Sequence, residues 1–190
     1  MIHRIDVSDA LRRSVCELYS DLVTRPTGAA VRRAIEEQLA LVDGRTLTVI
    51  DFSQVGLLDF SCADEVVAKL LLRYAAEPPP DDGYFLFRGV REVHFDAIEA
   101  VLERHQLALV ILGDDGAAQL VGAVDELERA AWGLLERDGR RAPAQVAAAL
   151  GRDLADAAAV LDGLCRRRVA LRLADGVVAV GLTLLAGRPQ

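Results

Sequence analysis

The sequence predicts an α/β domain over residues 1–122, followed over residues 123–190 by a small winged helix-turn-helix domain. Up to about residue 113, short apolar segments alternate with longer amphipathic ones, the pattern of parallel strands joined by helices. After about residue 123 come three short helical segments and then two apolar segments around a turn. Hydrophobic residues make up 52% of the chain and aromatic residues only 5%, so Leu, Val and Ala should fill the cores.

Five segments of the first domain are predicted as strands: 2–7, 14–23, 46–52, 84–90 and 107–113. The first alternates apolar and polar residues, whereas the third is rich in β-branched residues and should be a buried central strand. The first two strands should form a hairpin, and the later ones should be parallel because helices connect them. The sheet is therefore expected to be mixed.

Three amphipathic helices are predicted between these strands, over 28–42, 61–75 and 94–106. The second is the clearest, because its apolar residues recur at the spacing of one helix face. With only three helices available, they should lie mainly on one face of the sheet. The Pro-rich segment 77–83 should be a surface loop.

The second domain should contain helices over 125–139, 143–151 and 152–168, and a hairpin over 169–185 around Asp175-Gly176. Three helices and a hairpin are typical of a winged helix. Because the rhythm changes near residue 123, we expect the two domains to fold as separable units.

The net charge of −7 argues against nonspecific nucleic-acid binding, which requires a positive surface. Residues 125–190 hold 10 Arg and 9 acidic residues, so the remaining 12 basic and 20 acidic residues give the first domain a charge of −8. An acidic first domain suits protein binding. The three cysteines form no CxxC pair, and we expect free thiols in a reducing compartment. With neither a signal peptide nor an apolar run long enough to cross a membrane, the expected location is the cytoplasm.

Enzyme motifs are missing from the sequence. It contains no GxGxxG, Walker A, GxSxG or HExxH motif. The histidines, His3, His94 and His105, lack the spacing of metal ligands and are expected to be packing or surface residues. We therefore expect a protein that is not an enzyme and has no metal or cofactor.

The segment 48–71 resembles the STAS domain, the fold of anti-sigma factor antagonists. In that family a buried strand ends in Asp-hydrophobic-Ser, and Asp-Ser-Ser/Thr-Gly begins the next helix. Asp51-Phe52-Ser53 matches the first motif, and residues 59–62, Asp-Phe-Ser-Cys, resemble the second. The order of elements over about 1–120 is also similar.

The resemblance implies that Ser61 is a phosphoacceptor, with Asp59 and Asp51 as supporting acids. The kinase would be the partner itself, an anti-sigma factor of the GHKL type, which the unmodified form would bind. Asp64 and Glu65 would belong to the partner-binding surface. Two residues depart from the family pattern, because Phe60 replaces a hydroxyl residue and Cys62 replaces the glycine.

Ser61 also has a purely structural interpretation. A Ser at the start of a helix commonly serves as its N-cap, and Asp64 three residues later resembles a capping box. The sequence leaves both roles open.

DNA binding by the winged helix is possible but disfavoured. With Leu154, Ala158 and Leu161 facing inward together with Cys165, the outward face of the predicted recognition helix carries two carboxylates and no hydrogen-bond donor suited to bases. The cluster Arg166-Arg167-Arg168 at its end would suit phosphate contacts or the helix dipole.

The leading hypothesis is a signalling adaptor that binds a partner protein through its STAS-like domain. A transcription regulator that binds DNA through the winged helix is the first alternative, and a structural subunit of a larger complex is the second. A homodimer is compatible with all three.

Overall fold

Five strands form one mixed sheet in the computed structural model, which describes residues 2–16 and 20–181. The strand order is β1–β2–β3–β4–β5. Strands β1 to β4 run parallel to one another, and β5 runs antiparallel to β4. Their bounds are β1 (Ile2–Asp6), β2 (Thr46–Asp51), β3 (Gly83–Arg88), β4 (Ala108–Leu112) and β5 (Ala118–Gly122).

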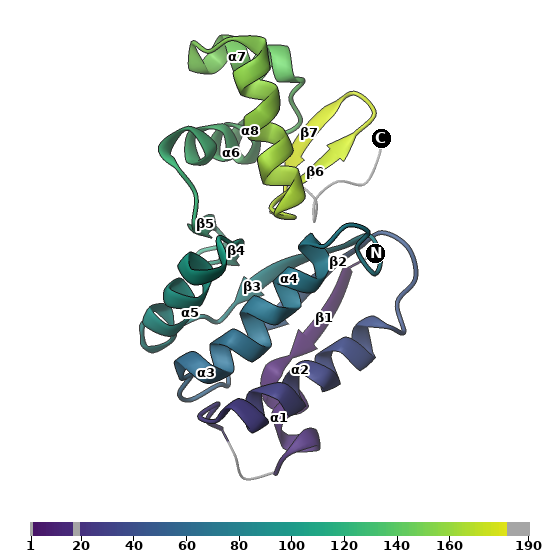
Figure 1. The fold of residues 1–190 in the computed structure, drawn as a ribbon, viewed down its shortest axis with the longest axis vertical. Coiled ribbons are helices and arrows are strands. Elements are labelled where there is room, and N and C mark those ends of the chain that lie inside the picture. The colour runs from purple at the N-terminus through teal and green to yellow at the C-terminus, as the bar shows by residue number, and fades with distance from the viewer. Residues whose placement is uncertain (1, 17–19, 182–190) are drawn as a thin grey trace.

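Helices from the first part of the chain cover one face of this sheet (Figure 1). They are α1 (Val7–Ser14), α2 (Arg25–Leu39), α3 (Phe60–Ala63), the π-helical turn η1 (Asp64–Ala68), α4 (Lys69–Ala75) and α5 (Glu92–His105). Their apolar faces pack on Ile50, Phe85 and Phe87 of the central strands, and this cluster forms the first core. The predicted α/β architecture is thus confirmed.

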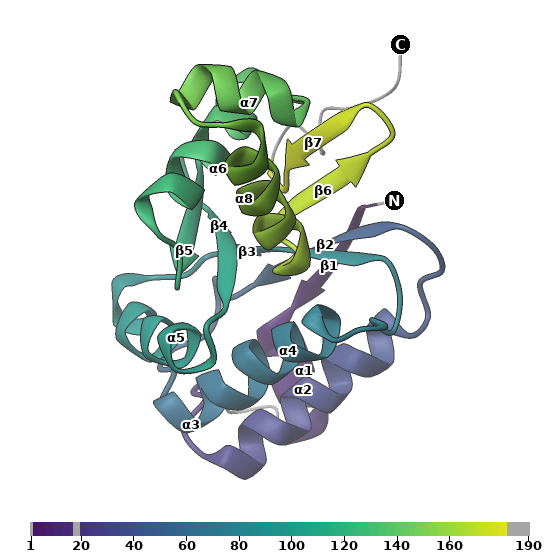
Figure 2. The same ribbon diagram turned by 45° about the horizontal axis from the view of Figure 1, so that its top comes forward.

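The opposite face of the sheet is covered by the last third of the chain (Figure 2). That part consists of α6 (Glu126–Asp138), α7 (Pro143–Leu150), α8 (Leu154–Arg166) and the antiparallel pair β6 (Ala170–Leu173) and β7 (Gly176–Ala179). Leu47, Leu86 and Val110 of the sheet share a second core with Trp132 and Leu161. The alternation of side chains along each strand sends neighbouring residues into different cores, which explains why these strands are apolar throughout.

The expectation of an N-terminal hairpin is wrong. Residues 7–14 form α1, capped by Asp6, whose side chain accepts hydrogen bonds from the Ser8 and Asp9 amides. Within the described part of 14–23, Leu22 makes only an isolated bridge with Leu58; residues 17–19 lie outside the described residues. The antiparallel pair lies instead at the other edge, where β5 was not anticipated.

Two helices also differ from the expectation. The helix expected over 28–42 begins earlier, at Arg25, where Thr24 is the N-cap. The helix expected over 61–75 contains the π-helical turn η1 in its middle. In the predicted hairpin 169–185 the two strands are β6 and β7, and residues 182–185 lie outside the described residues.

Candidate functional site

The segment between β2 and α3 brings Asp59 and Ser61 together. Asp59 is the N-cap of α3, and its Oδ1 accepts a hydrogen bond from the Cys62 amide at 2.7 Å. The same oxygen accepts a hydrogen bond from the Ser61 hydroxyl at 2.9 Å. The interpretation of Ser61 as the N-cap is therefore wrong, because the capping group belongs to Asp59. Ser61 lies in the first turn, and its side chain is partly exposed.

Backbone hydrogen bonds fix the start of α3 against the segment that precedes α2. The Leu22 amide donates to the Leu57 carbonyl at 2.8 Å, and the Asp59 amide donates to the Leu22 carbonyl at 2.9 Å. The Cys62 thiol donates to the Thr24 carbonyl at 2.9 Å. Burial, followed by the nearby Asp59 charge, raises the pKa of Cys62 to about 12, so Cys62 is a packing residue and not a reactive thiolate.

Asp51 lies at the end of β2 and has its own partners. Its Oδ1 accepts hydrogen bonds from the Ser53 amide at 2.9 Å and the Ser53 hydroxyl at 2.5 Å, and its Oδ2 lies 3.1 Å from Nε of Arg88. Among the described contacts none joins Asp51 to Asp59 or Ser61. Asp51 thus orders the β2 end of the segment, while Asp59 contacts the hydroxyl directly.

Asp64 and Glu65 are buried in η1, with exposed fractions of 7% and 2%. Asp64 accepts a hydrogen bond from Nη1 of Arg25 at 2.7 Å and pairs with Nε2 of His105 at 2.8 Å. Their expected role as exposed partner-binding residues does not fit this burial. Sequence reasoning missed the charge network because its members lie about 40 residues apart.

Glu65 is the centre of this network. It pairs with Arg25 at 2.9 Å, with Nε of Arg32 at 3.4 Å and with Lys69. Burial raises the pKa of Asp64 and Glu65, but the hydrogen bonds from the cations outweigh it, and the net pKa of each lies below its usual value. Both side chains are therefore anionic at neutral pH and hold α2 against η1.

His94 and Arg91 support the segment between β2 and α3 from the other side. The Arg91 side chain donates to the carbonyls of Val55 and Gly56, the latter at 2.9 Å. His94 is fully buried, its Nδ1 accepts from the Arg91 amide at 3.2 Å, and its Nε2 lies 3.1 Å from the Gly56 carbonyl. Because Nδ1 accepts, the ring is neutral with its proton on Nε2. Burial accordingly lowers the pKa of His94.

Three exposed apolar side chains lie on the two chain segments that meet at the start of α3, next to Asp59 and Ser61 in sequence or across the backbone hydrogen bonds. Val23, Leu57 and Phe60 are 44%, 54% and 38% exposed, and they lie on the two hydrogen-bonded segments described above. We call these three residues, with Asp59 and Ser61, the Ser61 surface. Exposed apolar side chains gathered around polar groups are typical of protein-binding sites.

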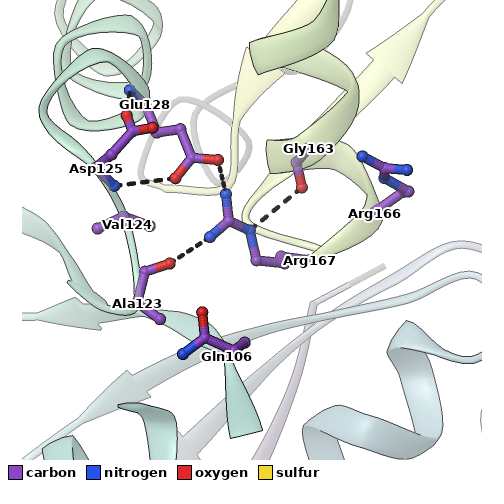
Figure 3. A pocket seen from close by; sticks show the side chains of 8 residues that line it. All are labelled: Gln106, Ala123, Val124, Asp125, Glu128, Gly163, Arg166 and Arg167. Carbon is purple, nitrogen blue, oxygen red and sulfur yellow. Dashed lines mark hydrogen bonds and ion pairs between the residues drawn. The ribbon is translucent and has the colours of Figure 1, made fainter.

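The arginine cluster at the end of α8 is divided between internal contacts and solvent. Arg167 donates to the Ala123 carbonyl and pairs with Glu128, across a pocket of about 630 Å³ between α8 and the start of α6 (Figure 3). Arg166 is exposed, and Figure 3 shows no hydrogen bond or ion pair from it to the residues drawn. Arg167 therefore joins α8 to α6.

Arg168 contacts the sheet domain. Its Nε donates to the Tyr74 carbonyl at 3.3 Å, its Nη1 donates to Asp82 at 3.2 Å, and its guanidinium lies over the Tyr84 ring. Its φ of 59° lies in the left-handed region, which a residue with a side chain adopts only at a cost. Of the three arginines proposed for phosphate contacts, Arg167 and Arg168 are thus used inside the fold.

For α8, the polar residues expected to face outward are exposed, but one apolar residue expected to face inward is not buried. Asp156 and Asp162 are exposed, as expected. Leu154, expected to face inward, is 57% exposed, and Ala157 is buried in its place.

No group of histidine, cysteine and carboxylate side chains placed to hold a metal ion occurs in the described residues. The same part of the chain contains no helix with the length and apolar character needed to cross a membrane. Searches against protein-family models, curated proteins and solved structures find no match to this chain.

Proposed function

We propose that this protein is a non-enzymatic regulatory adaptor whose STAS-like sheet domain binds a partner protein at the Ser61 surface. In this proposal the partner is a cytoplasmic anti-sigma factor that is also a GHKL-type kinase, and phosphorylation of Ser61 controls binding. One observation carries the proposal: a partly exposed serine hydroxyl lies 2.9 Å from a carboxylate, at a helix start whose neighbouring residues include exposed apolar side chains.

The geometry at Ser61 supports phosphoryl transfer by a bound kinase. The hydroxyl oxygen would form a bond to the γ-phosphorus of a nucleoside triphosphate held by the kinase, and the bond from that phosphorus to the β–γ bridging oxygen would break. The nucleoside diphosphate would leave. Asp59 already accepts the hydrogen bond from the hydroxyl, so it is placed to take the proton that the hydroxyl loses.

A phosphate on Ser61 would change both the helix start and the surface. It would add a charge of about −2 next to Asp59, so the two anions would compete for the amides of the first turn of α3. Asp59 would be displaced from the Cys62 amide, and the segment held by Leu22 and Leu57 would lose its fixed position. The partner would then meet a more negative and less ordered surface, which favours release.

The C-terminal part resembles a winged helix in its order of elements, and in our proposal it covers the sheet and does not read DNA. The outward face of α8 carries Asp156 and Asp162, which would face a polyanion. Two of the three arginines of the cluster, Arg167 and Arg168, are occupied within the fold. Both observations disfavour a transcription regulator.

The test is capture of a partner from a native lysate, with four versions of the full chain as bait: wild type, Ser61→Ala, Ser61→Asp and Ser53→Asp. Ser53 is the matched control, because it is a partly buried serine bonded to a carboxylate at the same end of the sheet. The proposal expects a kinase-class protein on wild type, Ser61→Ala and Ser53→Asp, but not on Ser61→Asp. Equal capture by all four baits would overturn it.

A further inference from the structure

A pocket of about 300 Å³ lies between the end of α8 and the end of α4. Both views place these two helix ends next to each other (Figures 1 and 2). The lining includes four arginines from three parts of the chain, Arg45, Arg166, Arg168 and Arg172. The whole chain has a net charge of −7, so this gathering of cations stands out from the rest of the molecule. Like charges around one pocket repel one another, and a bound anion relieves that repulsion.

Two carboxylates lie near the sheet side of the pocket. Glu77 is the one carboxylate in the lining, and it is exposed. Asp82 lies outside the lining and is shared by two cations, because its carboxylate is 2.6 Å from Nε of Arg45 and 3.2 Å from Nη1 of Arg168. On this side two carboxylates thus face two guanidinium groups.

Arg166 and Arg172 present hydrogen-bond donors on the other side of the pocket. Arg166, the last residue of α8, is exposed, and within the described residues its guanidinium makes no hydrogen bond or ion pair. Arg172 of β6 is also exposed and pairs with Asp162 through Nη2, which leaves other N–H groups of its guanidinium for a ligand. Because Asp162 is the third carboxylate against four guanidinium groups, the pocket keeps a positive charge.

The chemistry of the lining selects a compact phosphate compound. Guanidinium groups bind phosphate oxygens through paired, charge-assisted hydrogen bonds. Tyr74 and Tyr84 also line the pocket, but they are only 4% and 7% exposed, and the guanidinium of Arg168 lies over the Tyr84 ring. Neither ring therefore offers an open face on which a nucleotide base could stack. The volume is also at the small end of the range for ligand pockets.

We propose that this pocket binds a diphosphate group. Two phosphoryl groups suit it better than one, because Arg166 and Arg172 lie on different elements and each can hold one group. Arg168 and Arg45 add positive charge from the side of the sheet, so the bound anion stabilises α8 and β6 against the first part of the chain. The pocket and Ser61 lie at opposite ends of the helical segment 60–75, roughly 20 Å apart at 1.5 Å per residue, so the two sites are separate.

Calorimetric titration of the full chain with pyrophosphate, in metal-free buffer of low ionic strength, tests the proposal. One pyrophosphate should bind per chain, more weakly as salt is added, and it should raise Tm. Inorganic phosphate should bind about ten-fold more weakly, since it reaches one of the two arginines. ADP carries the same diphosphate with a base attached and should bind no tighter than pyrophosphate. No binding and an unchanged Tm at about 5 mM pyrophosphate would overturn the proposal, and so would ADP binding ten-fold tighter, because a base would then be recognised.

Matched charge variants locate the bound anion. The double variant Arg166→Gln/Arg172→Gln should weaken pyrophosphate binding about ten-fold, as expected for the loss of two exposed charged contacts. The control Arg152→Gln/Arg140→Gln makes the same charge change outside the lining and should leave the affinity unchanged. It is matched, because Arg152 is exposed like Arg166, and Arg140 pairs with an exposed aspartate as Arg172 does.

Equal weakening by both double variants would show nonspecific attraction to the chain and overturn the site. Amide NMR spectra establish that each variant is folded. The single variant Arg166→Gln removes no hydrogen bond or ion pair of the described residues, so it keeps the test decisive if the double variant fails to fold. It should weaken pyrophosphate binding about three-fold, and an affinity equal to wild type would contradict the role of Arg166.

Discussion

The second core predicts that residues 1–122 do not form a stable domain by themselves. A chain ending at residue 122 would expose the sheet face that α6, α8 and the β6–β7 hairpin cover. That face carries five aliphatic side chains that are at most 7% exposed: Leu47, Val49, Leu86, Val110 and Leu120. Burial of a Val or Leu side chain contributes at least about 1.5 kcal/mol, so the loss is roughly 7 kcal/mol, comparable to the whole stability of a typical domain.

The assay compares residues 1–122 with the full chain by thermal unfolding and by the dispersion of the amide NMR spectrum. We expect the truncated chain to show poor dispersion, strong binding of a hydrophobic dye and no cooperative transition. A milder perturbation of the second core is Leu86→Ala in the full chain, which should lower the free energy of unfolding by about 3 kcal/mol. Leu72→Ala, at an exposed leucine, is its control. A well-dispersed spectrum and an unchanged Tm for residues 1–122 would refute the reasoning and restore two separable domains.

Three further predictions concern the groups around the Ser61 surface. Glu65→Gln should lower the free energy of unfolding, measured by urea titration, by about 2 kcal/mol. The loss should be smaller than for a fully buried ion pair because the cations that pair with Glu65 are partly exposed. Glu37→Gln, at an exposed carboxylate, is the control and should change the free energy little. In the folded protein the pKa of His94 lies below its ordinary value of 6.5, so as the pH falls below 6.5 the unfolded chain binds a proton before the folded one does, and the free energy of unfolding should fall. In His94→Gln the urea midpoint should depend less on pH over this range. Asp59→Ala should cost about 1 kcal/mol as a lost cap, and a Tm equal to wild type would contradict the capping role.

The central strands and the main helices were predictable from local pattern alone. The runs that became β2, β3 and β4 are apolar because they contribute to both cores, and this signal needs no knowledge of the fold. The failures concern elements whose conformation depends on distant partners. The short segment β5 is a strand because it pairs with β4. Helix α1 follows β1 directly, and the N-cap Asp6 is the only residue between their apolar positions that signals a helix start.

The sequence located the serine of the candidate site but not the contacts around it. The motif located Asp59 and Ser61, yet the sequence could not say which of them caps α3, because both residue types are good caps. Asp64 and Glu65 were expected at the surface, since carboxylates are rarely buried without partners. Their partner Arg25 lies on another helix, so only the tertiary structure reveals the pairing.

Partner affinity and thermal stability, measured on wild type, Ser61→Ala and Ser61→Asp, test the proposed switch most directly. Ser61→Ala removes one hydrogen bond to Asp59, so it should lower stability by no more than about 1 kcal/mol and leave the partner bound. Ser61→Asp places a carboxylate in the first turn of α3, where the helix dipole tolerates it, so it should melt near wild type yet lose partner binding. If affinity instead follows stability across the three proteins, Ser61 is not a switch.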